Sequence, residues 1–184
     1  MKVRRLGPWV GSILVASVIA VGASAAGAHV EVVPSSAPKG GSEILSFNVP
    51  NEEENANTVT VQVNLPTKYP IASVSTQPMP GWSTVVKKSK LAKPVQSDDG
   101  EVTEAVTQIT WTATDGGLKP GEFGLFTISA GPLPTNTNQL VFKAIQTYSD
   151  GTTVNWIQQT VKGTPEPEHP APVLKLTKAA SDHH

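Results

Sequence analysis

Apolar residues recur at every second position in several short stretches of this chain, and this period constrains its fold more than any other feature. Such alternation is typical of a half-buried β-strand. Other short stretches are rich in β-branched and aromatic residues, which also favour strands. Together these stretches occupy residues 45–49, 59–65, 107–111, 123–128, 140–145 and 154–161. We therefore predict an all-β chain.

Segments rich in Pro, Gly, Asn and Asp separate the predicted strands. They lie at residues 34–41, 50–57, 66–70, 78–81, 97–100, 115–117, 131–138 and 149–151. The pair Asp150-Gly151 between two strand-like runs predicts a two-residue hairpin turn, because such turns need positive φ angles. Many short strands joined by closely spaced turns predict an immunoglobulin-like antiparallel β-sandwich.

The first 28 residues have the pattern of a secretory signal peptide. Basic residues at positions 2, 4 and 5 precede an apolar run at 13–21, which is followed by the small-residue triplet Ala26-Gly27-Ala28. This triplet matches an A-x-A cleavage site, and the apolar run is shorter than the roughly 20 residues of a membrane-spanning helix. We expect cleavage after Ala28, which makes His29 the first residue of an exported protein, extracellular or in the cell envelope or periplasm.

The rest of the chain has the size of one domain and a tail. We expect the β-sandwich domain to occupy residues 29–162. Residues 163–184 begin with the Pro-rich stretch Gly163-Thr-Pro-Glu-Pro-Glu-His-Pro, which predicts a flexible, extended tail. Loose metal capture by the tail histidines His169, His183 and His184 is the weaker interpretation of these residues.

Composition excludes several classes of function. The chain has no cysteine, so it has neither disulfides nor thiolate metal sites. Three of its 14 basic residues precede His29, which leaves 11 basic against 15 acidic residues, a formal charge of −4, and no arginine. A weakly acidic chain of this kind lacks the basic surface that binds nucleic acid.

An amino-terminal histidine offers two nitrogen ligands on one residue. A free α-amino group has a pKa of about 7.7 to 8.0, so a metal displaces its proton readily at neutral pH. The amine and the imidazole Nδ1 of His29 would close a six-membered chelate ring, which suits tetragonal Cu(II). Glu31 or the acidic turn Glu52-Glu53-Glu54 would supply a carboxylate. On composition alone, however, a first-residue histidine is more often accidental than functional.

Several fragments of the chain, taken in order, resemble the YcnI-like copper-binding family. They are His29-Val-Glu-Val-Val-Pro-Ser, Phe47-Asn-Val-Pro-Asn-Glu52, Val63-Asn-Leu-Pro, Pro80-Gly-Trp82, Ile109-Thr-Trp111, Lys143-Ala-Ile-Gln-Thr-Tyr-Ser-Asp-Gly151 and Val154-Asn-Trp156. Each fragment is weak alone, and the ordered set is specific.

The resemblance implies an exported sandwich that binds Cu(II) through a single-histidine brace. In that pattern His29 and Glu52 are the metal ligands. Trp156 closes over the metal without binding it, since an indole N–H is only a donor. Many relatives carry a membrane-spanning segment near the carboxyl end. Here Val173-Leu-Lys-Leu176 is too short for one, so we expect no membrane span after signal cleavage.

These observations favour a copper carrier, chaperone or store in copper acquisition and homeostasis. Its partners would be the copper ion and a membrane copper transporter or another copper carrier. We expect no enzyme, because copper monooxygenases and Ser-His-acid hydrolases need a domain histidine and none lies between Val30 and Lys162. The alternative is a metal-independent module that binds a glycan or protein through Tyr69, Trp82, Tyr148 or Trp156.

Overall fold

The computed structural model describes residues 29–97 and 100–179. The predicted signal peptide and the two last histidines lie outside the described residues. Within them every regular element is a strand, which confirms the all-β prediction. The strands are β1 (Glu31–Val33), β2 (Ser36–Pro38), β3 (Glu43–Pro50), β4 (Thr58–Asn64), β5 (Ser73–Thr76), β6 (Trp82–Ser97), β7 (Gly100–Ala113), β8 (Phe123–Gly131), β9 (Gln139–Val141), β10 (Lys143–Tyr148), β11 (Thr153–Trp156) and β12 (Val173–Thr177).

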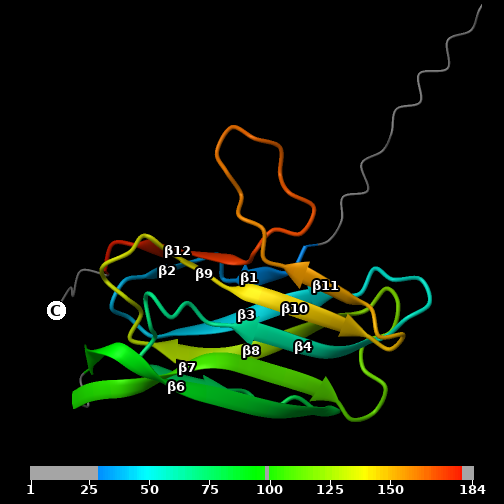
Figure 1. The fold of residues 1–184 in the computed structure, drawn as a ribbon, viewed down its shortest axis with the longest axis horizontal. Helices are drawn as coiled ribbons and strands as arrows, with labels where there is room; N and C mark the ends of the chain where they lie inside the picture. The colour runs from blue at the N-terminus through cyan, green and yellow to red at the C-terminus, as the bar shows by residue number, and fades with distance from the viewer. Residues whose placement is uncertain (1–28, 98–99, 180–184) are drawn as a thin grey trace, which may run out of the picture.

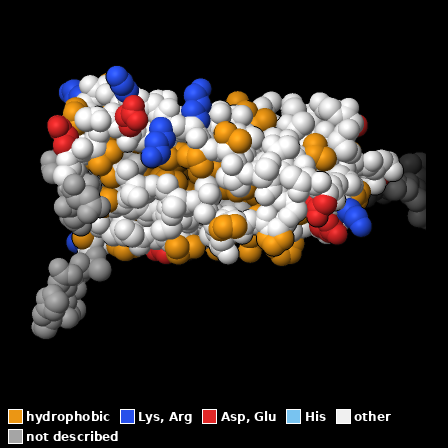
Figure 2. Space-filling view, turned by 90° about the horizontal axis from the view of Figure 1, so that it is seen from below, with side chains coloured by type: hydrophobic (Ala, Val, Ile, Leu, Met, Phe, Trp, Pro, Cys, Tyr) orange, Lys and Arg blue, Asp and Glu red, His pale blue; other side chains and the backbone are white. Residues whose placement is uncertain are grey.

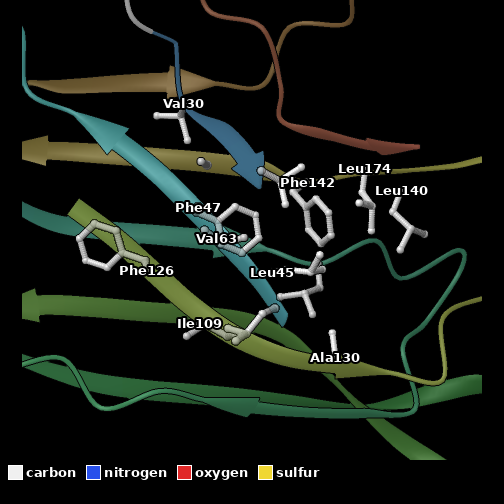
Figure 3. Packing of buried hydrophobic residues seen from close by; sticks show 14 of the residues in the cluster. Val30, Leu45, Phe47, Val63, Ile109, Phe126, Ala130, Leu140, Phe142 and Leu174 are labelled. Atoms are coloured by element: carbon white, nitrogen blue, oxygen red, sulfur yellow. The ribbon is translucent and has the colours of Figure 1, made fainter. Parts of the chain in front are cut away.

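Two main sheets form the sandwich (Figure 1). One has the strand order β1-β3-β8-β5 and the other the order β11-β10-β4-β7-β6. A small third sheet has the order β2-β12-β9. Aromatic rings from the two main sheets meet between them: the ring centroids of Trp111 on β7 and Phe126 on β8 are 5.4 Å apart. Figure 3 shows this core, in which Phe47 on β3 and Val63 on β4 are both fully buried.

The period of two in the sequence appears directly as burial. On β3, Leu45, Phe47 and Val49 are fully buried, whereas Ile44 on the opposite face is 56% exposed. On β8, Phe126 is fully buried while Leu125 is exposed. Hydrophobic side chains are therefore visible at the surface as well (Figure 2). The burial of alternate side chains is what stabilises the sandwich.

The hairpin between β10 and β11 is confirmed, but its loop is one residue longer than predicted. The Tyr148 N–H donates to the Thr152 carbonyl at 2.9 Å, so Thr152 is a paired residue. Ser149, Asp150 and Gly151 form the loop, and Gly151 takes the positive φ of 88° that closes a three-residue hairpin. Strand β11 also ends at Trp156, where the sequence predicted a run to residue 161.

The prediction of a flexible tail from residue 163 is wrong for its central part. Strand β12 pairs parallel with β2 and antiparallel with β9. Its residue Leu174 is fully buried and packs near Leu140 and Phe142 (Figure 3). After the Pro-rich stretch the chain returns to the sandwich, where the alternating sequence Val173-Leu-Lys-Leu176 forms the central strand of the third sheet. The folded domain therefore extends to Thr177 and does not end at residue 162.

Candidate metal centre

His29 lies at one end of the sandwich, two residues before β1. Its position is fixed by Val30 and Val32, which are 2% and 3% exposed. Strand β1 pairs with β3 so that Glu31 faces Asn48. If that antiparallel register is extended by two residues, His29 is level with Pro50, the last residue of β3. The His29 side chain remains 26% exposed and accessible to a metal ion.

Trp156 lies beside His29, although the two residues are far apart in the sequence. It is the last residue of β11, is paired with Ala144 and is 7% exposed. The centroids of the Trp156 and His29 rings are 5.9 Å apart and the rings are tilted by 57°. The structure thus brings together these two of the three residues that the sequence analysis selected.

A buried glutamine, Gln146, holds Trp156 in place. The indole Nε1 of Trp156 donates to Oε1 of Gln146 at 3.1 Å. Nε2 of Gln146 donates to the Pro50 carbonyl and to Oγ1 of Thr58, both at 2.8 Å. The orientation of the amide follows from its partners, because an indole nitrogen only donates and a carbonyl oxygen only accepts. Gln146 therefore connects Trp156 to the end of β3, and the sequence analysis missed it.

Glu52, the third predicted residue, is exposed on the loop that follows Pro50. Asn51, only 1% exposed, organises this loop. Its Nδ2 donates to the carbonyls of Ala56 and Leu118, and its Oδ1 accepts from the Glu53 N–H at 3.0 Å. An Asn that bonds the N–H two residues on is a common turn device. The loop follows Pro50, which lies level with His29 in the extended β1–β3 register. Glu52 and His29 therefore belong to the same end of the sandwich.

Besides burial, the negative charge of the acidic loop contributes to a raised pKa of Tyr148 on β10. Burial raises the pKa of Tyr148 to about 12, and the nearby carboxylates of Glu53, Glu52 and Asp150 add to the rise. Tyr148 is 4% exposed. A low-dielectric environment disfavours the phenolate, and neighbouring negative charge does so further.

Residues 157–172 connect β11 to β12 and form a long loop that we call the strap (orange to red in Figure 1). It brings Oε1 of Glu166 to 3.6 Å from Nδ1 of His29. It also places the ring of His169 edge-on against Trp156, with centroids 5.1 Å apart. Neither contact is predictable from the sequence pattern, because Glu166 and His169 lie in the Pro-rich stretch that predicts a tail. A groove with a volume of about 710 Å³ runs beside them and is lined by His29, Glu31, Glu166 and Lys175, among others.

The donors at this end of the sandwich fit Cu(II). Within residues 29–97 and 100–179, no group of three or more His, Asp and Glu side chains is close enough to form a complete metal cluster. His29 offers an accessible imidazole nitrogen next to a carboxylate oxygen, and nitrogen and oxygen ligands suit Cu(II). Cleavage before His29 would add its α-amino nitrogen as a further ligand.

The aromatic side chains considered for stacking are largely unavailable. Tyr148 and Trp156 are buried, and Tyr69 and Trp82 are half-buried against the core. The Trp82 ring packs edge-on against Phe126 at 4.9 Å. Trp111 is fully buried, as expected for a core residue. These positions disfavour the alternative of a stacking platform.

Comparison with known proteins identifies the family. The family described as a domain of unknown function, DUF1775, matches residues 29–176. The chain belongs to the DUF1775 family. The match reaches residue 176 and so covers all but the last residue of β12. It also confirms the resemblance to YcnI-like proteins that the ordered fragments indicated.

Two relatives extend this finding. The copper-binding protein CutI of Bacillus subtilis (strain 168) is 31% identical over 159 residues, which cover 86% of this chain and 68% of CutI. A crystal structure of an uncharacterised Nocardia farcinica protein with an immunoglobulin-like fold is 39% identical, with a TM-score of 0.66, and the match covers 82% of this chain and 99% of that one. This DUF1775 chain is thus an immunoglobulin-like β-sandwich, as predicted. No helix within its described ranges is long and apolar enough to cross a membrane.

Proposed function

We propose that this protein binds Cu(II) at the end of the sandwich where His29 and Trp156 meet, and that it carries or stores copper outside the cytoplasm. The observation that carries the proposal is the position of His29, which β1 holds 5.9 Å from the Trp156 ring. The identity of 31% with the copper-binding protein CutI supports copper as the metal.

In this proposal the amine and Nδ1 of His29 bind Cu(II) and Glu52 supplies an oxygen. Cleavage after Ala28 creates the amine. Trp156 covers one side of the ion and limits the access of water, which tunes a bound metal. The hydrogen bond from Trp156 to Gln146 keeps the ring in place while the ion enters and leaves.

Transfer to a partner follows from the choice of ligands. Cu(I) prefers sulfur ligands, and this chain has no cysteine. Met79, the one methionine after the predicted cleavage site, packs against the core. One-electron reduction to Cu(I) by an external reductant would therefore weaken the hold on copper and release it to a transporter or another carrier. We propose a carrier or store and no catalytic activity.

A titration separates this function from the alternative of a glycan-binding module. One equivalent of Cu(II) added to the secreted protein is expected to give a d–d absorption band and an EPR spectrum of a tetragonal site. The His29→Ala variant is expected to lose both at the same concentration. Binding to a glycan array without metal, together with no stoichiometric uptake of copper, would refute the proposal.

A further inference from the structure

The strap is closed at its base, so it holds its residues in defined positions. The Gln158 N–H donates to the His169 carbonyl at 3.0 Å, and the Ala171 N–H donates to the Gln158 carbonyl at 2.8 Å. Oε1 of Gln158 accepts from the His169 N–H at 2.6 Å. Three hydrogen bonds thus join the outgoing and returning ends of the strap around Gln158.

Contacts with the sandwich fix this base next to the metal centre. The His169 ring packs edge-on against Trp156, and Pro170 and Ala171 are buried. Trp156 itself lies against His29. Glu166 is three residues before His169, and its side chain, 64% exposed, reaches to His29.

The distance between His29 and Glu166 is informative. At 3.6 Å, Nδ1 and Oε1 are further apart than the roughly 2.7 to 3.2 Å of an N–H···O hydrogen bond. Nitrogen and carboxylate ligands lie about 2.0 to 2.2 Å from a small divalent ion such as Zn²⁺, so two ligands of one ion are about 3 to 4 Å apart. At 3.6 Å the two atoms are close enough for a small movement of the exposed Glu166 side chain to bring both onto one ion.

We propose that Glu166 is a second carboxylate ligand of the copper ion held by His29, delivered by the strap. This inference rests on the proposed function. His29 and Glu52 would supply two nitrogens and one oxygen, and a tetragonal Cu(II) site has room for a fourth ligand in its plane. Two carboxylates also neutralise the charge of Cu(II). Glu166 thus completes the site with residues of this chain.

Three variants of the secreted protein test the role of Glu166. Glu166→Gln removes the charge and the ligand, and Glu166→Asp keeps the charge but withdraws the carboxylate by one methylene. Glu168→Gln is the matched control, since Glu168 is exposed on the same strap. Cu(II) affinity is measured by competition with a chelator of known affinity, and the coordination by EPR.

We expect Glu166→Gln to weaken Cu(II) binding by at least about tenfold, because even the loss of a residue that only supports the ligands lowers metal affinity by about that factor. We also expect the EPR parameters at saturation to change. Glu166→Asp is expected to lose affinity too, and Glu168→Gln to stay within about twofold of the wild type because it removes charge without a ligand. Amide hydrogen exchange in the strap is expected to slow on adding Cu(II) to the wild type and not to Glu166→Gln.

The outcomes separate the two proposals. If the wild type binds one equivalent of Cu(II) and Glu166→Gln has the same affinity and spectrum, Glu166 is not a ligand and the proposed function stands. Equal losses in Glu166→Gln and Glu168→Gln would reveal a general charge effect and also overturn the inference. If the wild type takes up no stoichiometric copper, the proposed function itself fails.

Discussion

The indole nitrogen of Trp156 donates a hydrogen bond to Oε1 of Gln146 at 3.1 Å, and the same amide donates to the carbonyl of Pro50. This chain of bonds joins β11 and β10 to the end of β3. The candidate metal centre lies beside Trp156, the last residue of β11, with His29 on one side of its ring and His169 also against it.

Replacing Gln146 by Leu should destabilise the fold by about 1 to 3 kcal/mol, because it leaves the buried polar groups of Trp156, Thr58 and Pro50 without this partner. Urea unfolding followed by tryptophan fluorescence measures the loss. Gln159→Leu is the control, since Gln159 is exposed on the strap and its replacement should cost under about 0.5 kcal/mol. Equal stability of both variants would show that Gln146 does not organise the site.

Replacing Glu52 by Ala should weaken Cu(II) binding by at least about tenfold and leave the fold intact, because its side chain is exposed. Glu54→Ala in the same acidic loop is the matched control and should retain wild-type affinity. Isothermal titration gives the affinities and circular dichroism checks the fold. Superimposable titration curves for Glu52→Ala and wild type would remove Glu52 from the site.

The raised pKa of Tyr148 predicts a loss of stability at alkaline pH. The unfolded state releases the phenol proton near pH 10, whereas the folded state keeps it until about pH 12. The unfolded state therefore binds fewer protons between these values, and the free energy of unfolding should fall by about 2 to 3 kcal/mol from pH 10 to pH 12. Urea unfolding at both pH values measures this fall. Tyr148→Phe should show a clearly smaller fall, and an equal fall in both proteins would contradict the assignment.

Strand β12 should be essential for stability. Leu174→Ala removes a fully buried side chain and is expected to cost about 2 to 5 kcal/mol. Lys175→Ala, on the exposed face of the same strand, should change the free energy of unfolding by less than about 0.5 kcal/mol. A Leu174→Ala protein with wild-type stability would mean that the domain ends before β12.

The sequence was sufficient for the strands whose burial alternates over several residues. Residues 45–49 lie in β3 and residues 107–111 in β7, as expected. It was insufficient for β1, β2, β5 and β12, because three to five residues contain too little periodicity to stand out. It also missed the 16-residue strand β6, because residues 82–95 are mostly exposed and show no regular alternation of apolar side chains. Tertiary pairing determines whether such segments form strands. For the same reason residues 163–172 of the strap were assigned to a tail.

The same limit applies to the candidate site. His29 was recognisable from the cleavage pattern and Trp156 from the family resemblance. Gln146 and Glu166 were not, and His169 was considered only as a loose metal ligand in a tail, because only the folded chain brings these residues to His29 and Trp156. In the sequence Gln146 is a single polar residue within a predicted strand. Its three hydrogen-bond partners lie on β3, β4 and β11, which only the fold brings together. Asn51 was likewise missed, although an Asn after a Pro at a strand end is a recognisable turn feature.

The central claim is that cleavage exposes His29 and that its amine and imidazole together bind Cu(II). The most direct test compares the Cu(II) affinity of a protein beginning at His29 with that of a protein carrying one extra alanine before it. The extension keeps every side chain and moves only the amine. We predict that the protein beginning at His29 binds one equivalent of Cu(II) and that the extended protein binds it at least about tenfold more weakly. Equal affinities would contradict the account.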